Sequence, residues 1–252
     1  MKRYTHFLLF LFIGILQNCT GPFYLKDTKT SQVHLKQDSL QLVDSAIVKL
    51  IEPYKQKLDA QMNEVLNVSD VELLKERPEG TLCNFAADAV MWYGNKSYEK
   101  PIDLCVLNYG GLRIPFIQKG NITLGKIYEL MPFDNMVDVV EIDGKSCKQL
   151  LDIIAKNGGG PVSGVKFKIN NNRAEEVFIN GIPFDSTKTY TLVTSDYLVN
   201  GGDGLEMLKK TIKRTSLNYK IRDAIVDYVR EKKSTNKNIT TQKDGRITII
   251  QP

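Results

Sequence analysis

The sequence predicts a single domain of the α/β (α+β) class, in which mixed sheets are flanked by helices. The main observation is that short segments of helical and of strand periodicity alternate from Val71 to the end of the chain. Hydrophobic residues make up 42% of the 252 residues and charged residues 25%, proportions that are typical of globular proteins and argue against disorder. A chain of this length can bury a core that folds without disulfide bonds.

The first segment of the chain has the pattern of a secretion signal. Lys2 and Arg3 form a short basic region, and residues 7–16 that follow are apolar. An apolar stretch of about ten residues is too short to span a bilayer as a mature helix. We therefore predict a signal peptide at residues 1–18 and an exported protein.

The signal ends at Leu16-Gln17-Asn18-Cys19, which resembles the lipobox of bacterial lipoproteins. In that motif the chain is cut before the cysteine, and the cysteine carries lipid. Asn18 departs from the small residue that is usual before the cut, so an ordinary cleaved signal remains the alternative. We expect Cys19 to anchor the protein to a membrane, in the periplasm or at the cell surface.

A polar segment and a long helix come next. Residues 19–37 show little periodicity and are interpreted as a tether, and residues 38–252 as the folded domain. Asp38 can cap a helix in which apolar residues recur at three- and four-residue steps as far as Val65. Pro53 can kink this helix. Its apolar stripe is typical of a helix that packs on a core.

The remaining elements follow from periodicity and from turn residues. Gly94 is expected to end the first short helix, and an Asn180-Gly181 turn to close one strand. The expected helices are residues 84–93, 124–131, 145–156 and 221–232, and the expected strands are residues 102–107, 137–142, 165–169, 176–179, 190–199 and 246–250.

Composition excludes several classes of function. The formal charge of +5 is dispersed along the chain, as on a solvated surface, so we expect no nucleic-acid partner. Without Cys19 the cysteines are Cys83, Cys105 and Cys147, an odd number with no pair spaced for zinc. Cys105 lies in an apolar run and is expected to be a small core residue.

The domain also lacks the histidines of the common catalytic centres, although a lysine-based or carboxylate-only enzyme remains conceivable. Its two histidines are His6, in the signal, and His34, in the tether. A dinuclear metal hydrolase needs several histidine and carboxylate ligands, and a Ser-His-Asp or Cys-His arrangement needs a histidine in the domain. We therefore expect no catalytic residue and no metal or other cofactor in this chain.

Three segments marked by glycine, proline or asparagine carry the remaining information. Asn108-Tyr109-Gly110-Gly111-Leu112-Arg113 offers a close backbone approach and a forked cation suited to phosphate, although a tight turn with a solvated arginine would look the same. Leu130-Met131-Pro132-Phe133-Asp134-Asn135 places a phenylalanine at a helix end, where a core role is the alternative. The segment from Ser195 to Gly204 suits contact with a sugar or simply makes a strand-to-helix turn.

Together these segments resemble the C-terminal domain of 5′-nucleotidases. They match N-x-G-G-[IL]-R, L-x-P-F-x-N and S-D-[FY]-x-x-N-G-G-D-G in order and spacing, and residues 84–89 and 161–167 resemble two further motifs of that domain. The resemblance covers about residues 38 to 250. It implies a four-layer α/β/β/α fold, and it implies that the long helix corresponds to the linker between two domains.

The resemblance also implies a site for a nucleotide or nucleoside. Phe133 and Tyr197 would sandwich the base, where tyrosine replaces the commoner phenylalanine and keeps a π-face. Asn108 and Asn135 would contact the base edge, and Asp203 the ribose hydroxyls. Arg113 would face the phosphate or ribose, and Arg77 is a further candidate whose alignment is loose.

The family's metallophosphatase domain has no counterpart in this sequence. The first hypothesis is that the chain is the recognition half of a nucleotidase whose metals are held by a separate metallophosphatase chain that docks near the long helix. The second is a stand-alone lipoprotein that captures nucleosides or nucleotides. The third is an interaction module with a decayed site, which the intact Asn108, Arg113, Phe133, Tyr197 and Asp203 oppose.

Overall fold

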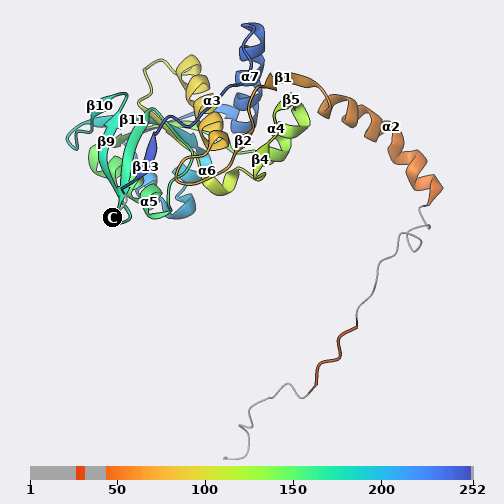
Figure 1. Cartoon of the computed structure of the whole chain (residues 1–252), viewed down its shortest axis with the longest axis horizontal. Helices are drawn as coiled ribbons and strands as arrows, with labels where there is room; N and C mark the ends of the chain where they lie inside the picture. The colour runs from red at the N-terminus through yellow and green to blue at the C-terminus, as the bar shows by residue number, and fades with distance from the viewer. Residues whose placement is uncertain (1–26, 32–43, 251–252) are drawn as a thin grey trace, which may run out of the picture. The chain divides into compact units, whose positions relative to one another are not determined.

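The computed structural model describes residues 27–31 and 44–250 (Figure 1). The chain divides into two units, residues 1–50 and residues 51–252. Of the first unit the structure describes an exposed segment without regular structure at residues 27–31 and the beginning of helix α2. The signal peptide, Cys19, both histidines and the expected cap at Asp38 lie outside the described residues.

Helix α2 (Ser45–Met62) differs from the expected packing helix. The described helix begins after Asp44, whose carboxylate accepts a hydrogen bond from the backbone N–H of Ala46 at 2.8 Å. None of its residues is buried, and Tyr54 and Leu58 keep 76% and 52% of their surface exposed. The 3–4 spacing therefore identified a helix but not a packing partner, because periodicity records an apolar face and not what covers it.

A five-stranded sheet lies at the centre of the second unit. Its strand order is β12-β6-β11-β3-β7, and all neighbours are antiparallel except β11 and β3, which run parallel. Residues alternate between its faces, so that Val137 and Val139 join one buried cluster and Val140 and Ile142 the other. The strands are β3 (Leu104–Val106), β6 (Met136–Asp143), β7 (Val162–Ser163), β11 (Thr189–Ser195) and β12 (Lys213–Lys220).

Helices cover both faces of this sheet. Helices α3 (Thr81–Ser97), α4 (Leu124–Leu130) and α7 (Ile221–Ser234) pack on one face, with Phe85 and Ile225 among their buried residues. On the other face α5 (Gly144–Lys156) packs together with a second, four-stranded sheet of order β10-β9-β8-β13. That sheet consists of β8 (Val165–Asn170), β9 (Arg173–Ile179), β10 (Ile182–Pro183) and β13 (Ile247–Ile249). The α/β class with mixed sheets is confirmed.

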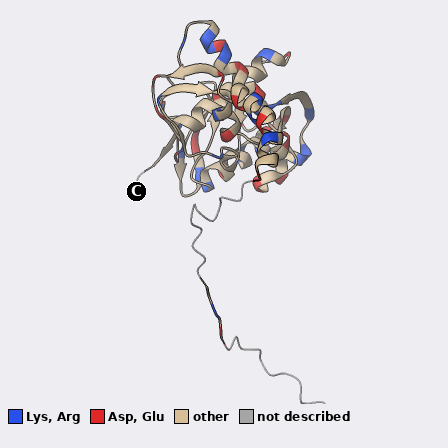
Figure 2. Ribbon diagram, turned by 90° about the vertical axis from the view of Figure 1, so that its right-hand side faces the viewer, with Lys and Arg blue, Asp and Glu red and all other residues tan. Residues whose placement is uncertain are grey.

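Two short ribbons complete the described elements. One pairs β1 (Val65–Ser69) with β5 (Gly120–Thr123), and the other pairs β2 (Leu73–Leu74) with β4 (Phe116–Ile117). None of these four strands was expected, and β2 and β4, with two residues each, are too short for alternation to be detected. Basic and acidic residues alternate along the ribbon of the domain, without a long run of either kind (Figure 2).

Two element boundaries differ from the expectation for reasons of packing. Helix α3 continues through Gly94 to Ser97. Glycine is required at position 94 for close packing and not for helix termination, because a side chain there would meet Ile102 and Val193. The expected strand 190–199 ends at Ser195, whose hydroxyl accepts from the N–H of Leu198 and caps the short helix α6 (Asp196–Val199).

Candidate functional site

The three expected segments meet at one edge of the five-stranded sheet. Strands β3 and β11 are parallel neighbours, so Asn108 and α6 follow them at the same edge. Strand β6 runs antiparallel to β11 and pairs Val137 with Ser195, which brings its preceding loop, Met131–Asn135, to that edge as well. The topology therefore gathers segments that are far apart in sequence.

Phe133 lies on the Met131–Asn135 loop, between α4 and β6, with 44% of its surface exposed. Arg222, the second residue of α7, forms hydrogen bonds to this loop. Its Nη1 donates to the carbonyl oxygens of Met131 (3.3 Å), Pro132 (3.1 Å) and Phe133 (3.4 Å), and its Nη2 donates to the Asp134 carboxylate at 2.7 Å. The Arg222 side chain is only 7% exposed, so the loop that carries Phe133 is hydrogen-bonded to a buried side chain.

One carboxylate connects the Phe133 loop to α6. Oδ1 of Asp196 accepts from Nδ2 of Asn135 and from the backbone N–H of Met136, both at 3.1 Å, and also from the N–H of Tyr197 at 2.8 Å. The two aromatic residues, Phe133 and Tyr197, are thus carried on segments that are fixed to each other.

Tyr197 lies on α6 and is 40% exposed. Its ring packs directly on the backbone of Gly202, since a Cβ built there would lie 2.4 Å from Cε1 of the ring. Its hydroxyl donates to Oδ1 of Asp203 at 2.8 Å and accepts from the N–H of Asp203 at 3.3 Å. The hydrogen bond to this carboxylate raises the pKa of Tyr197 above its ordinary value.

The end of α6 has a longer-range support. Asn200 accepts a hydrogen bond at 2.8 Å from Arg214 of β12, and the same guanidinium pairs with the buried Asp138 of β6 at 2.6 Å. The turn from Asn200 to Asp203 is therefore attached to the sheet.

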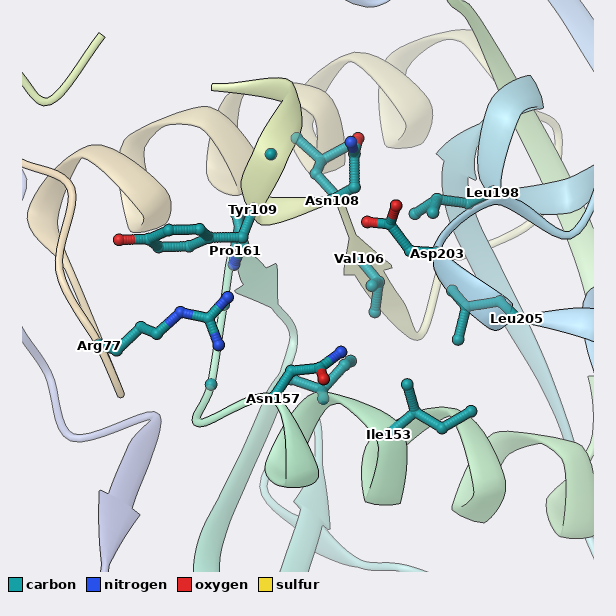
Figure 3. A pocket seen from close by; sticks show the side chains of 15 residues that line it. Arg77, Val106, Asn108, Tyr109, Ile153, Asn157, Pro161, Leu198, Asp203 and Leu205 are labelled. Atoms are coloured by element: carbon teal, nitrogen blue, oxygen red, sulfur yellow. The ribbon is translucent and has the colours of Figure 1, made fainter. Parts of the chain in front are cut away.

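A cavity opens beside Asn108, Asp203 and Arg77 (Figure 3). Arg77 and Asp203 lie on opposite sides of it, and Ile153 of α5 and Asn157, the residue that follows α5, form part of its wall. Pro78, the residue after Arg77, packs closely on Gly159: a Cβ built at Gly159 would lie 2.1 Å from the carbonyl oxygen of Pro78. The missing side chain at Gly159 therefore allows Arg77 to lie at the cavity. The cavity encloses about 530 Å³, including its open mouth.

Three cations surround this edge. The guanidinium of Arg77 and the ammonium of Lys75 each lie 4.2 Å from the ring centre of Tyr109, and the guanidinium of Arg113 lies 5.6 Å from that of Phe133. Burial, followed by the nearby charges of Arg113 and Arg77, lowers the pKa of Lys75. In residues 44–250 none of the three cations forms an ion pair with a carboxylate, and the carboxylate of Asp203 lines the same cavity as Arg77.

The structure thus brings the expected site residues together in two linked groups. Asn108, Arg77 and Asp203 line the cavity, while Arg113, Phe133, Asn135 and Tyr197 stand beside it. Sequence reasoning missed Arg222, Asp196, Lys75 and Asn157. Asp196 stands inside a motif that had been singled out, whereas Arg222 has no local signal because it acts on a loop about ninety residues earlier.

The described residues hold no metal site and no membrane helix. Across residues 27–31 and 44–250 no group of three or more His, Cys, Asp or Glu side chains could hold a metal ion. The helices in the same part of the chain are too short or too polar to cross a bilayer.

A family model and two relatives of known name all relate this chain to nucleotide-hydrolysing proteins. A family model described as the C-terminal domain of 5′-nucleotidase matches residues 60–210. An apyrase from Tabanus yao is 28% identical over 81% of this chain and 41% of its own length. The trifunctional nucleotide phosphoesterase protein YfkN from Bacillus subtilis is 30% identical over 78% of this chain and 14% of its own length.

A solved structure extends this similarity to the fold. A 5′-nucleotidase precursor from Thermus thermophilus matches 83% of this chain with a TM-score of 0.71 and 27% identity, and the chain covers 44% of that protein. The chain spans less than half the length of each of these relatives.

Proposed function

This chain belongs to the 5′-nucleotidase C-terminal domain family, and on that premise we propose that it recognises a nucleotide or nucleoside at the sheet edge described above. The observation that carries the proposal is the pair of half-exposed rings, Phe133 on the Met131–Asn135 loop and Tyr197 on α6, which Asp196 connects. Half-exposed rings on rigid supports are suited to stack on a planar base, and such stacking contributes roughly 1–3 kcal/mol per base.

The neighbouring groups fit the rest of a nucleotide. The side-chain NH2 group of Asn135 donates to Asp196, which leaves the side-chain oxygen of Asn135 for a base edge. The side chain of Asn108 offers both a donor and an acceptor. The carboxylate of Asp203 suits ribose hydroxyls. Arg113 and Arg77, both without a carboxylate partner among the described residues, suit a phosphate.

We further propose that hydrolysis requires a metallophosphatase on a separate chain. The support is that the described residues contain no cluster of metal ligands, while the matched relatives are much longer and carry the names of nucleotide-hydrolysing enzymes. This domain would bind the base and sugar, and the partner would supply the divalent metals and the chemistry at the phosphate.

Calorimetric titration with AMP and adenosine, run beside a phosphate-release assay with added manganese or zinc, tests both statements. We expect binding in the millimolar to micromolar range and no metal-dependent turnover by the pure protein. Turnover at ordinary enzyme rates would refute the need for a partner, and absence of binding would refute the recognition site. Binding with no activity in the presence of any metallophosphatase encoded nearby would favour the stand-alone capture function.

We also propose that the protein is exported and anchored through Cys19. The support is the basic and apolar signal pattern that ends in Leu16-Gln17-Asn18-Cys19. Fractionation of cells that express the wild type and Cys19→Ser tests the anchor. We expect the wild type in the membrane fraction and the variant outside it, and equal membrane association of both would contradict the lipid anchor.

A further inference from the structure

The hydroxyl of Tyr197 has a role that ring stacking does not require. It lies 2.8 Å from Oδ1 of Asp203, to which it donates, and it accepts from the N–H of Asp203 at 3.3 Å. The two residues therefore form a closed pair, in which one hydroxyl satisfies both a carboxylate oxygen and a backbone N–H. A phenylalanine would keep the aromatic face and lose both hydrogen bonds.

Asp203 has no other fixed support among the described residues. Its carboxylate forms no ion pair there, and Oδ2 has no hydrogen-bond partner in the same part of the chain. Its backbone is left-handed, with φ of 53°, between Gly202 and Gly204. A side chain on such a turn, exposed at the mouth of a cavity, would otherwise exchange between rotamers, so the Tyr197 hydroxyl selects one orientation of the carboxylate.

We infer that the hydroxyl of Tyr197 determines the preference for ribose over deoxyribose, because it holds Oδ2 of Asp203 ready to accept from a sugar hydroxyl. The inference rests on the proposed function, in which Asp203 contacts the ribose. A carboxylate that is already ordered loses less side-chain freedom when the ligand binds. A site built to accept a hydroxyl also discriminates against the analogue that lacks it, because its polar atoms are then left unpaired once the ligand covers them.

The consequence is a separation of two roles within one side chain. The ring face acts on the base, which all nucleosides present, and the hydroxyl acts through Asp203 on the sugar. Tyr197→Phe should therefore leave binding of a free base unchanged and reduce discrimination between sugars. Tyr197 is thus a specificity-determining residue as well as a wall of the base site.

The test measures dissociation constants for adenine, adenosine, 2′-deoxyadenosine and 3′-deoxyadenosine, with the guanine series in parallel, in the wild type and Tyr197→Phe. We expect the ratio of deoxy to ribo dissociation constants to fall about three- to tenfold in the variant, while the constant for the free base changes less than about twofold. In an Asp203→Ala background, Tyr197→Phe should change the ratio no further, because the hydroxyl acts through that carboxylate.

Tyr219→Phe is a matched control. It removes a tyrosine–aspartate hydrogen bond of similar length, 2.7 Å to Asp227, on the α7 side of the domain, and should leave the ratio unchanged. An unchanged ratio in Tyr197→Phe, or an equal loss for base and nucleoside, would overturn this inference alone. Failure of the wild type to bind any of the probes would instead overturn the proposed function, and the inference with it.

Discussion

The two aromatic walls of the site, Phe133 and Tyr197, are supported in different ways. The loop of Phe133 is held by Arg222, whose guanidinium reaches three consecutive carbonyl groups from the start of α7. The ring of Tyr197 is fixed by residues within six positions of it, Gly202 and Asp203. The supporting residues of Tyr197 can be recognised in a short sequence motif, because they are its neighbours in the chain. The supporting residue of Phe133 lies on a distant helix and can be recognised only in the folded structure.

The largest effect should come from Arg222→Met, which removes the support of the Phe133 wall. The buried carbonyl of Met131, the partly buried carbonyls of Pro132 and Phe133 and the exposed carboxylate of Asp134 would lose a charged donor, which typically costs about 2 kcal/mol. We expect a loss of that size in the free energy of unfolding, measured by urea denaturation, together with weaker adenosine binding. Arg230→Met is the control, since Arg230 pairs with Glu64 on the surface and should cost less than about 1 kcal/mol. Equal costs for the two variants would contradict the role given to Arg222.

Asp196→Ala should affect both walls at once. The variant loses three hydrogen bonds, to Asn135, Met136 and Tyr197, and at about 0.5–1.5 kcal/mol each we expect a loss of about 2 kcal/mol in stability. Because the Phe133 loop and α6 are then no longer connected, binding of free adenine should weaken as well. Unfolding curves and calorimetry on the same samples check both expectations, and a stable variant with unchanged adenine affinity would show that the walls are fixed independently.

Gly202→Ala should damage the Tyr197 wall alone. The new methyl group would lie 2.4 Å from the ring, so the ring must turn away from its stacking position. We expect adenine binding to weaken by roughly 1–3 kcal/mol, the value of one stacking contact, with a smaller change in unfolding free energy. If Gly202→Ala binds adenine as the wild type does, the Tyr197 ring is not part of the base site.

The smallest effect concerns pH and the Phe133 loop. Hydrogen bonds from Arg222 and then from Lys220 lower the pKa of Asp134 below its ordinary value of 3.8. A lowered folded-state pKa means that this contribution to stability is present above pH 3.8 and is lost as pH falls through the folded-state value. We expect Asp134→Asn to reduce the slope of stability against pH in that acid range only. An unchanged slope would mean that the ion pair does not couple to folding.

The sequence predicted more of the site than of its supports. Residues 108–113, 130–135 and 195–204 stood out because asparagine, glycine and proline mark turns, and the structure gathers all three segments at one sheet edge. Their ligand roles remain predictions. Asp196 and Arg222 were missed for a physical reason, since their partners lie about sixty and ninety residues away and no local pattern records such contacts.

The helices and strands of the fold also differ in how well the sequence predicted them. Strongly periodic segments, such as α5 and β6, were predicted almost to their ends. Strand β12 was missed because its burial does not alternate cleanly and its sequence is rich in Lys and Arg, which resembles an exposed segment. The boundaries at Gly94 and Ser195 depend on packing and on a hydroxyl cap, and periodicity reports neither.

The most direct test of the proposed base site is calorimetric titration of adenosine into the wild type and into the Phe133→Ala, Tyr197→Ala double variant, with melting curves of both. Both rings are about half exposed, so their truncation should cost little stability. If they form a stacking site, the double variant should lose roughly 2–6 kcal/mol of binding free energy, which removes detectable binding. A folded double variant with unchanged affinity for adenosine would contradict the site and the function proposed from it.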